Sequence, residues 1–173
     1  MNRLRIGGMV IALLTLAAGG MLFTAFNHPK AAEQPLAFSH KSHAGGEQIP
    51  CLYCHIEARR SAVAGVPTVK LCMGCHASLK VTTSNPQQLQ ALAQLQAHWE
   101  KDQPISWVRV YNQPDHVRFS HQRHLVKGID CEACHGPVQT MERTQEAIVW
   151  TMARCVSCHM EQKASIDCIT CHK

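Results

Sequence analysis

The sequence has little of what an ordinary globular core uses, because aromatic residues make up only 5% of its 173 residues. Common enzyme motifs are also missing: there is no glycine-rich phosphate loop, no Gly-x-Ser-x-Gly and no His-Glu-x-x-His. The net charge of +5 is mild, and no run of Lys and Arg concentrates it, which argues against nucleic-acid binding. A domain of this length therefore needs something other than aromatic side chains to fill its interior.

The chain is rich in two residue types that bind metals and cofactors, with 10 cysteines and 12 histidines. Every cysteine belongs to a Cys-x-x-Cys-His motif, which occurs five times. The motifs are Cys51/Cys54/His55, Cys72/Cys75/His76, Cys131/Cys134/His135, Cys155/Cys158/His159 and Cys168/Cys171/His172. This is the attachment signature of c-type haem, in which two thiols bond one porphyrin and the adjacent His reaches the iron. We therefore expect five covalently bound haem c groups, with these five histidines as proximal ligands, and the porphyrins themselves as the core.

Three alternative roles for the cysteines fit the sequence less well. A disulphide framework gives no reason for a His after every second Cys. Zinc sites commonly pair two Cys-x-x-Cys elements, and five such elements would leave one without a partner. A thioredoxin-like redox pair would need a βαβ pattern, which this sequence lacks.

The N-terminal segment decides the expected compartment. Residues 6–26 are uncharged and mostly apolar, follow Arg3 and Arg5, and as a helix would reach about 31 Å, enough to span a bilayer. The alternative is a cleaved secretory signal, but its apolar region is usually shorter and ends at a small-x-small site, which 24–26 (Thr-Ala-Phe) fits poorly. We expect an uncleaved single-pass anchor in the cytoplasmic membrane, with the basic end inside and the haem domain on the periplasmic side.

Seven further histidines are candidates for the opposite faces of the haems: His28, His40, His43, His98, His116, His121 and His124. Four of them belong to a repeated phrase, Phe-Ser-His-x-x-His, at 38–43 and 119–124, and each copy precedes a haem motif. An internal duplication is the simplest explanation. The three-residue spacing puts both histidines on one helical turn, from which they can serve two different haems.

A connector separates the two copies. Asn85 as cap and Pro86 in the first turn predict an amphipathic helix that runs to Glu100. His98 on this helix is expected to be a surface or packing residue rather than a ligand. The stretch from Trp107 to Pro114 is expected to be extended, with aromatic residues that pack on a porphyrin edge or on a partner.

The Phe-x-His-x-x-His phrase followed by haem motifs resembles the small class III cytochromes c. More closely, the order of anchor, two-haem half, the stretches 107–111 (WVRVY) and 114–117 (PDHV), and a three-haem half with 134–141 (CHGPVQTM) resembles the pentahaem cytochrome c subunit of alternative complex III. The likeness implies a class III-like multihaem fold, with low regular secondary structure, short helices around packed haems and one transmembrane helix. We expect an anchor at 1–30, a two-haem half at 31–84, a helix and connector at 85–115, and a three-haem half at 116–173.

The class III resemblance also implies a distal ligand set. His40 would cap the haem at Cys51/Cys54, His43 that at Cys72/Cys75, His121 that at Cys131/Cys134, and His124 that at Cys155/Cys158. In trihaem relatives the remaining haem takes a His just before the middle motif of the half. Met152 stands at about that place here and is the expected ligand of the haem at Cys168/Cys171, with His116 and Met141 as alternatives. A thioether ligand would make this the haem of highest potential.

Haems with both axial positions filled pass electrons and do not bind substrate at iron. The chain is therefore expected to be an electron-transfer subunit with no catalytic residues of its own. The resemblance implies integral membrane quinol-binding subunits and an iron–sulphur subunit as partners, and a periplasmic acceptor such as a monohaem cytochrome c. The alternative is a stand-alone quinol dehydrogenase that feeds a periplasmic reductase. Only His28 and Glu33 near the anchor could accept a quinol proton, which favours quinol oxidation in a partner.

Overall fold

The computed structural model describes residues 13, 15 and 31–172. The chain divides into two compact units, 1–30 and 31–173, and the architecture below is that of the second. The expected anchor, 6–26, lies outside the described residues except for positions 13 and 15. Among the residues that the structure describes, none forms a helix that is both long and apolar enough to cross a membrane.

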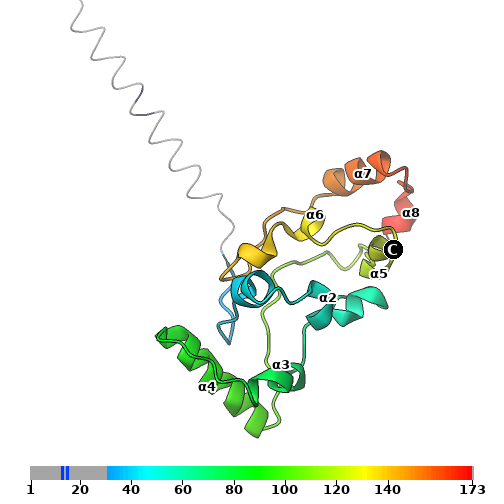
Figure 1. Ribbon diagram of the computed structural model, residues 1–173. Helices are drawn as coiled ribbons and strands as arrows, with labels where there is room; N and C mark the ends of the chain where they lie inside the picture. Colours follow the sequence, from blue (N-terminus) through cyan, green and yellow to red (C-terminus); the bar gives the residue numbers. More distant parts are fainter. Residues whose placement is uncertain (1–12, 14, 16–30, 173) are drawn as a thin grey trace, which may run out of the picture. The chain divides into compact units, whose positions relative to one another are not determined.

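The second unit consists of short helical segments joined by loops (Figure 1). In chain order the segments are η1 (Lys41–Gly46), α2 (Cys51–Cys54), η2 (Ile56–Arg59), α3 (Val69–His76), α4 (Pro86–Glu100), α5 (His121–Val126), α6 (Glu132–His135), η3 (Val138–Thr140), α7 (Met152–Glu161) and α8 (Cys168–Cys171). Within 31–172 the β-structure is limited to an isolated antiparallel bridge between Val117 and His172. This low content of regular structure agrees with the sequence prediction.

The longest described helix, α4, begins where the sequence predicts. The Asn85 side chain accepts a hydrogen bond from the backbone N–H of Gln87 at 2.9 Å, and Pro86 occupies the first turn. An N-cap side chain satisfies an otherwise unpaired N–H, and proline at the first helical position loses no helical hydrogen bond. The predicted helix from Asn85 to Glu100 is therefore confirmed.

Only a small side-chain core is present in the described part of the chain. Leu36, Met73, Ala91 and Leu95 form its buried centre, with Phe38, Val69, Cys72, Ile105 and Trp107 partly buried around it. This cluster packs α3 against α4 and joins Ile105 and Trp107 of the connector to Leu36 and Phe38. Trp107 lies against Phe38, with ring centroids 6.3 Å apart.

The two halves of this unit, each of which carries one copy of the histidine phrase, are tied together by reciprocal hydrogen bonds. The backbone N–H groups of His121 and Gln122 donate to the carbonyls of Ala62 and Ser61, at 3.1 and 3.2 Å. In the other direction, the N–H of Lys41 donates to the carbonyl of Met141 at 3.0 Å. Each histidine phrase is thus held by the loop that follows the first haem motif of the other half.

Candidate haem-binding sites

The five Cys-x-x-Cys-His motifs all lie on helical turns. Their helices are α2, α3, α6, α7 and α8, and the cysteines of each motif are separated by about one turn. The proximal His either ends the helix, as His76 and His135 do, or directly follows it, as His55 and His172 do; His159 lies within α7. This geometry puts two thiols and one imidazole of each motif on the same side of the backbone.

Each proximal histidine has a second imidazole facing it. The ring-centroid distances are 6.5 Å for His40–His55, 6.0 Å for His43–His76, 6.2 Å for His121–His135, 6.1 Å for His124–His159 and 5.6 Å for His116–His172. The rings of three pairs are nearly parallel, at 8°, 7° and 16°, and those of the other two are tilted by 52° and 42°.

These separations fit an iron between two imidazoles. An imidazole nitrogen binds a metal ion at about 2 Å, so two rings on opposite faces of one iron have centroids roughly 6 Å apart. The five pairs span 5.6 to 6.5 Å. The residues therefore fit five haems, each with a proximal and a distal histidine.

The first four pairs are those that the class III resemblance implies, but the fifth is different. His116 is the ring that faces His172, whereas the sequence ranked Met152 first and His116 second for this haem. Met152 is 66% exposed at the first residue of α7. Met141 follows η3, and its carbonyl receives the N–H of Lys41 from the other half. The geometry favours His116 as the fifth distal ligand over Met152 and Met141.

Hydrogen bonds set the tautomer of half of these ligands. The Nδ1 atoms of five ligand histidines lie 2.6–2.9 Å from backbone carbonyls: His43 from Ser39, His55 from Gly65, His121 from Ala62, His124 from Ser120 and His159 from Ser165. A carbonyl only accepts, so each Nδ1 carries the proton and donates it. Nε2 is then left with a free lone pair for a metal, and the hydrogen bond raises its basicity.

His40 has a side-chain partner in place of a carbonyl. Its Nδ1 lies 2.9 Å from Oγ1 of Thr144, which belongs to the other half. The pKa of His40 is lowered to about 4, first by burial and then by the neighbouring rings of His55 and His43. Burial, followed by nearby histidines, also lowers the pKa values of His76 and His135. These sites favour neutral imidazole, the form that binds metal.

The phenylalanine of each phrase fixes the ring orientations. Phe38 stacks on His43 with centroids 4.4 Å apart and meets His40 edge-on at 4.9 Å. The second copy repeats this arrangement, with Phe119 at 4.6 Å from His124 and 4.8 Å from His121. In the sequence these phenylalanines serve only to identify the repeat. Their presence at the same position in both copies is the feature from which a role in orienting the histidines could have been predicted.

Tyr111, one of the aromatic residues of the predicted connector 107–114, lies at one of these sites, and Thr144 is a further site residue that the sequence did not single out. The Tyr111 ring meets His135 edge-on at 4.6 Å, and its hydroxyl donates to the carbonyl of His135 at 3.3 Å. The N–H of Ala147 donates to the same hydroxyl at 3.1 Å. Burial is the main cause of a raised pKa at Tyr111, which keeps the phenol protonated. No local motif marks these contacts, because each joins distant segments.

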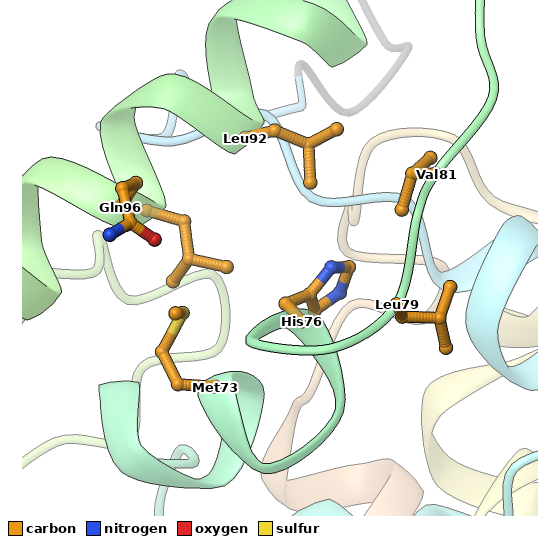
Figure 2. Close-up of a pocket in the computed structure, with 7 residues that line it drawn as sticks. Met73, His76, Leu79, Val81, Leu92 and Gln96 are labelled. Carbon is orange, nitrogen blue, oxygen red and sulfur yellow. The ribbon is translucent and has the colours of Figure 1, made fainter.

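A cavity of about 190 Å³ lies beside the second motif, between α3 and α4 (Figure 2). Its lining is apolar apart from His76 and Gln96, and includes Met73, Leu79, Val81, Leu92 and Leu95. Nδ1 of His76 is buried and has no hydrogen-bond partner among the described residues. His98, further along α4, bonds the carbonyl of Gln103 through Nδ1 at 3.1 Å. His28 lies outside the described residues.

Comparisons with known proteins agree with this geometry. Residues 117–173 match the family described as cytochrome c7 and related cytochrome c. The chain is also 26% identical, over 170 residues, to the multihaem cytochrome c subunit of menaquinone reductase from Nitratidesulfovibrio vulgaris. These similarities support a multihaem cytochrome c. The alignment covers 82% of this chain and 77% of the relative, so the chain is similar to the relative over most of its length and not only in its C-terminal half.

Proposed function

We propose that the chain is a pentahaem c-type cytochrome, anchored in the cytoplasmic membrane by its N-terminal segment, that carries electrons from a quinol-oxidising complex to a periplasmic acceptor. The five opposed imidazole pairs, one for each Cys-x-x-Cys-His motif, are the observation that carries this proposal. A histidine on both faces leaves no open iron position for a substrate, which favours electron transfer over catalysis.

The chain's own residues hold and tune the cofactors. When bound, haem c supplies reversible one-electron chemistry at iron. The cysteines would hold each porphyrin covalently, and the paired histidines would supply two nitrogen ligands to its iron. Nδ1 hydrogen bonds, such as that of His55 to the carbonyl of Gly65, make the ligands more basic and favour the ferric state.

The proposed partners are integral quinol-binding subunits, an iron–sulphur subunit of the same complex, and a periplasmic acceptor such as a monohaem cytochrome c. Two likenesses support a membrane complex of this kind: the sequence resemblance to the alternative complex III subunit, and the similarity to a menaquinone reductase subunit. Gentle solubilisation of membranes and identification of the proteins that co-purify tests it. Recovery of the chain alone, with the expected subunits absent, would contradict the proposal.

The haem count tests the core of the proposal. The purified full-length protein should contain five covalently bound haems by pyridine haemochrome assay and by intact mass, with a low-spin spectrum. A variant that replaces Cys168 and Cys171 with Ala should lose one haem, whereas His98→Ala should retain all five. Fewer than five haems in the unmodified protein would refute the pentahaem assignment.

A second candidate function is electron transfer through the same haems in the opposite direction, from a periplasmic donor to the quinone pool. The relative's name favours it, because that protein belongs to a menaquinone reductase. The direction is tested on the complex isolated from membranes. Rapid haem reduction by a menaquinol analogue, with slow haem oxidation by the menaquinone analogue, supports the first direction. The opposite pair of rates supports the second.

A further inference from the structure

The cysteine and histidine contacts imply an order of the haems in space that differs from their order in the sequence. We propose that the haem sites follow one another as the second, first, third, fourth and fifth motifs, so that the haems at Cys72/Cys75 and Cys168/Cys171 are the two ends of the array. This inference rests on the proposed function, because it assumes one haem at every motif.

The first and third motifs meet at the junction of the two halves. The side chains of Cys51 and Cys131 lie close together, although they belong to different motifs. Close by, Nδ1 of His121 bonds the carbonyl of Ala62 at 2.9 Å, and Nδ1 of His40 bonds Thr144 at 2.9 Å. Each distal ligand of this central pair is therefore held by the loop that follows the other haem's motif.

The second motif lies beside the first, on the side away from this junction. The side chain of Cys54 lies near those of Cys75 and Cys72. On its other side α3 packs against α4 through Met73 and Leu95, within the small side-chain core. The haem at Cys72/Cys75 thus has the first haem on one side and a protein helix on the other.

The remaining three motifs continue from the third. The side chain of Cys134 lies near those of Cys155 and Cys158, and the side chain of Cys155 lies near that of Cys171. At the far end, the N–H of Arg118 donates to the carbonyl of Cys171 at 2.7 Å, next to the bridge between Val117 and His172. The motif helices follow the same order across Figure 1: α3, α2, α6, α7 and α8.

The two histidine phrases explain how neighbouring haems are kept close. His40 and His43 lie on one turn and face the first and second proximal histidines, whereas His121 and His124 face the third and fourth. Each phrase therefore joins two adjacent haems through a three-residue spacing. A path in sequence order would need a direct step from the second haem to the third, and the first haem lies between them.

Electrons accordingly enter and leave at the haem between His43 and His76 and at the haem between His116 and His172. The first haem, although it comes first in the sequence, is internal and contacts two others. Partner docking should therefore be sensitive to the surroundings of the second and fifth motifs. The first and third motifs carry electrons across the junction of the halves.

Iron positions in the haem-loaded, full-length protein test the order directly, by anomalous diffraction or electron cryomicroscopy. The expected result is that the nearest irons to that of the first motif are those of the second and third. A second-motif iron nearest to the third-motif iron would overturn the order. Five haems with another adjacency refute this inference alone, whereas fewer than five haems refute the proposed function.

A matched pair of variants gives an independent readout by redox titration followed by electron paramagnetic resonance. His43→Met and His40→Met each raise the potential of one haem, because a thioether replaces an imidazole. Raising one potential also shifts the apparent potentials of haems in contact with it. His43→Met should shift one other component and His40→Met should shift two. Equal numbers of shifted components in the two variants would contradict the proposed order.

Discussion

At the scale of single residues, each Phe-Ser-His-x-x-His phrase orients its second histidine through contacts within the phrase itself. The carbonyl of Ser39 accepts the Nδ1–H of His43 at 2.9 Å, and that of Ser120 accepts the Nδ1–H of His124 at 2.8 Å. The phenylalanine stacks on the same ring. The second histidine of each phrase therefore receives both its tautomer and its orientation from residues four and five positions earlier.

The fifth distal ligand is tested by two substitutions. His116→Ala should leave one of the five haems without a sixth ligand, because the ring opposite His172 is removed. A high-spin ferric signal equivalent to one haem should then appear in the paramagnetic resonance spectrum. The matched variant Met152→Leu removes the thioether that the sequence ranked first and should leave the spectrum low-spin. A high-spin signal in Met152→Leu and none in His116→Ala would restore Met152 as the ligand.

Thr144 is expected to tune the haem between His40 and His55. Thr144→Val removes the hydroxyl that pairs with Nδ1 of His40, so the imidazole becomes a weaker donor and the potential of one haem should rise. Such partners typically change metal affinity by about 10–100-fold. Spectroelectrochemical titration measures the shift. Thr140→Val is the control, because its hydroxyl donates to the nearby carbonyl of Pro137; equal shifts in both variants would refute a specific effect.

The sequence could predict the ligands whose positions are set locally, and not those set by long-range packing. The proximal histidines adjoin their cysteines, and the phrase keeps two distal histidines within one turn. His116 meets His172 only because the end of the chain returns to the start of the three-haem half, where Val117 bridges His172. No local spacing records that return, and so Met152 was the stronger prediction.

At the scale of secondary-structure elements, local chemistry explains why the two copies of the phrase differ. The second copy forms an α-helix, α5, whereas the first forms the π-helical turn η1. Gly45 and Gly46 follow the first phrase, and the wider turn is closed by the N–H of Glu47 donating to Ser42 at 2.9 Å. The sequence predicted one helical turn for both copies, because hydrogen-bond register cannot be read from the histidine spacing alone.

The cap of α4 gives a prediction at this scale. Asn85→Ala removes the acceptor of the Gln87 N–H and should destabilise the protein by about 1 kcal/mol, the usual cost of losing such a cap. Thermal unfolding of the haem-loaded protein, followed by circular dichroism, measures the change. Asn85→Asp keeps an acceptor at the same place and should remain near the original stability. A loss of equal size in both variants would show that the cap is not the cause.

At the scale of the whole molecule, the duplication visible in the sequence suggested two consecutive halves, and the structure interlocks them. The loop at 61–62 supports the second phrase, and the stretch 141–144 supports the first. Lys41 and Glu142 add an ion pair across the junction at 3.2 Å. The repeat can be recognised from residue identity. The reciprocal hydrogen bonds between the two halves cannot be predicted in this way, because their acceptors are mostly backbone carbonyls and every residue has one.

The close approach of η1 to η3 at this junction gives the last prediction. A side chain at Gly45 would collide with the backbone carbonyl of Gln139 in the other half, and a backbone atom cannot move aside as the end of a flexible side chain can. Gly45→Ala should therefore push the halves apart and destabilise the haem-loaded protein by about 1–3 kcal/mol, the usual cost of overpacking.

Gly46→Ala is the matched control for this junction. A side chain there would meet only the carbonyl of Lys41, at an ordinary contact distance of 3.7 Å, so its melting temperature should stay close to that of the unmodified protein. Thermal unfolding measures both variants, and redox titration shows whether the coupling between the first and third haems weakens in Gly45→Ala alone. Equal melting temperatures for the two variants would mean that the halves do not depend on this contact.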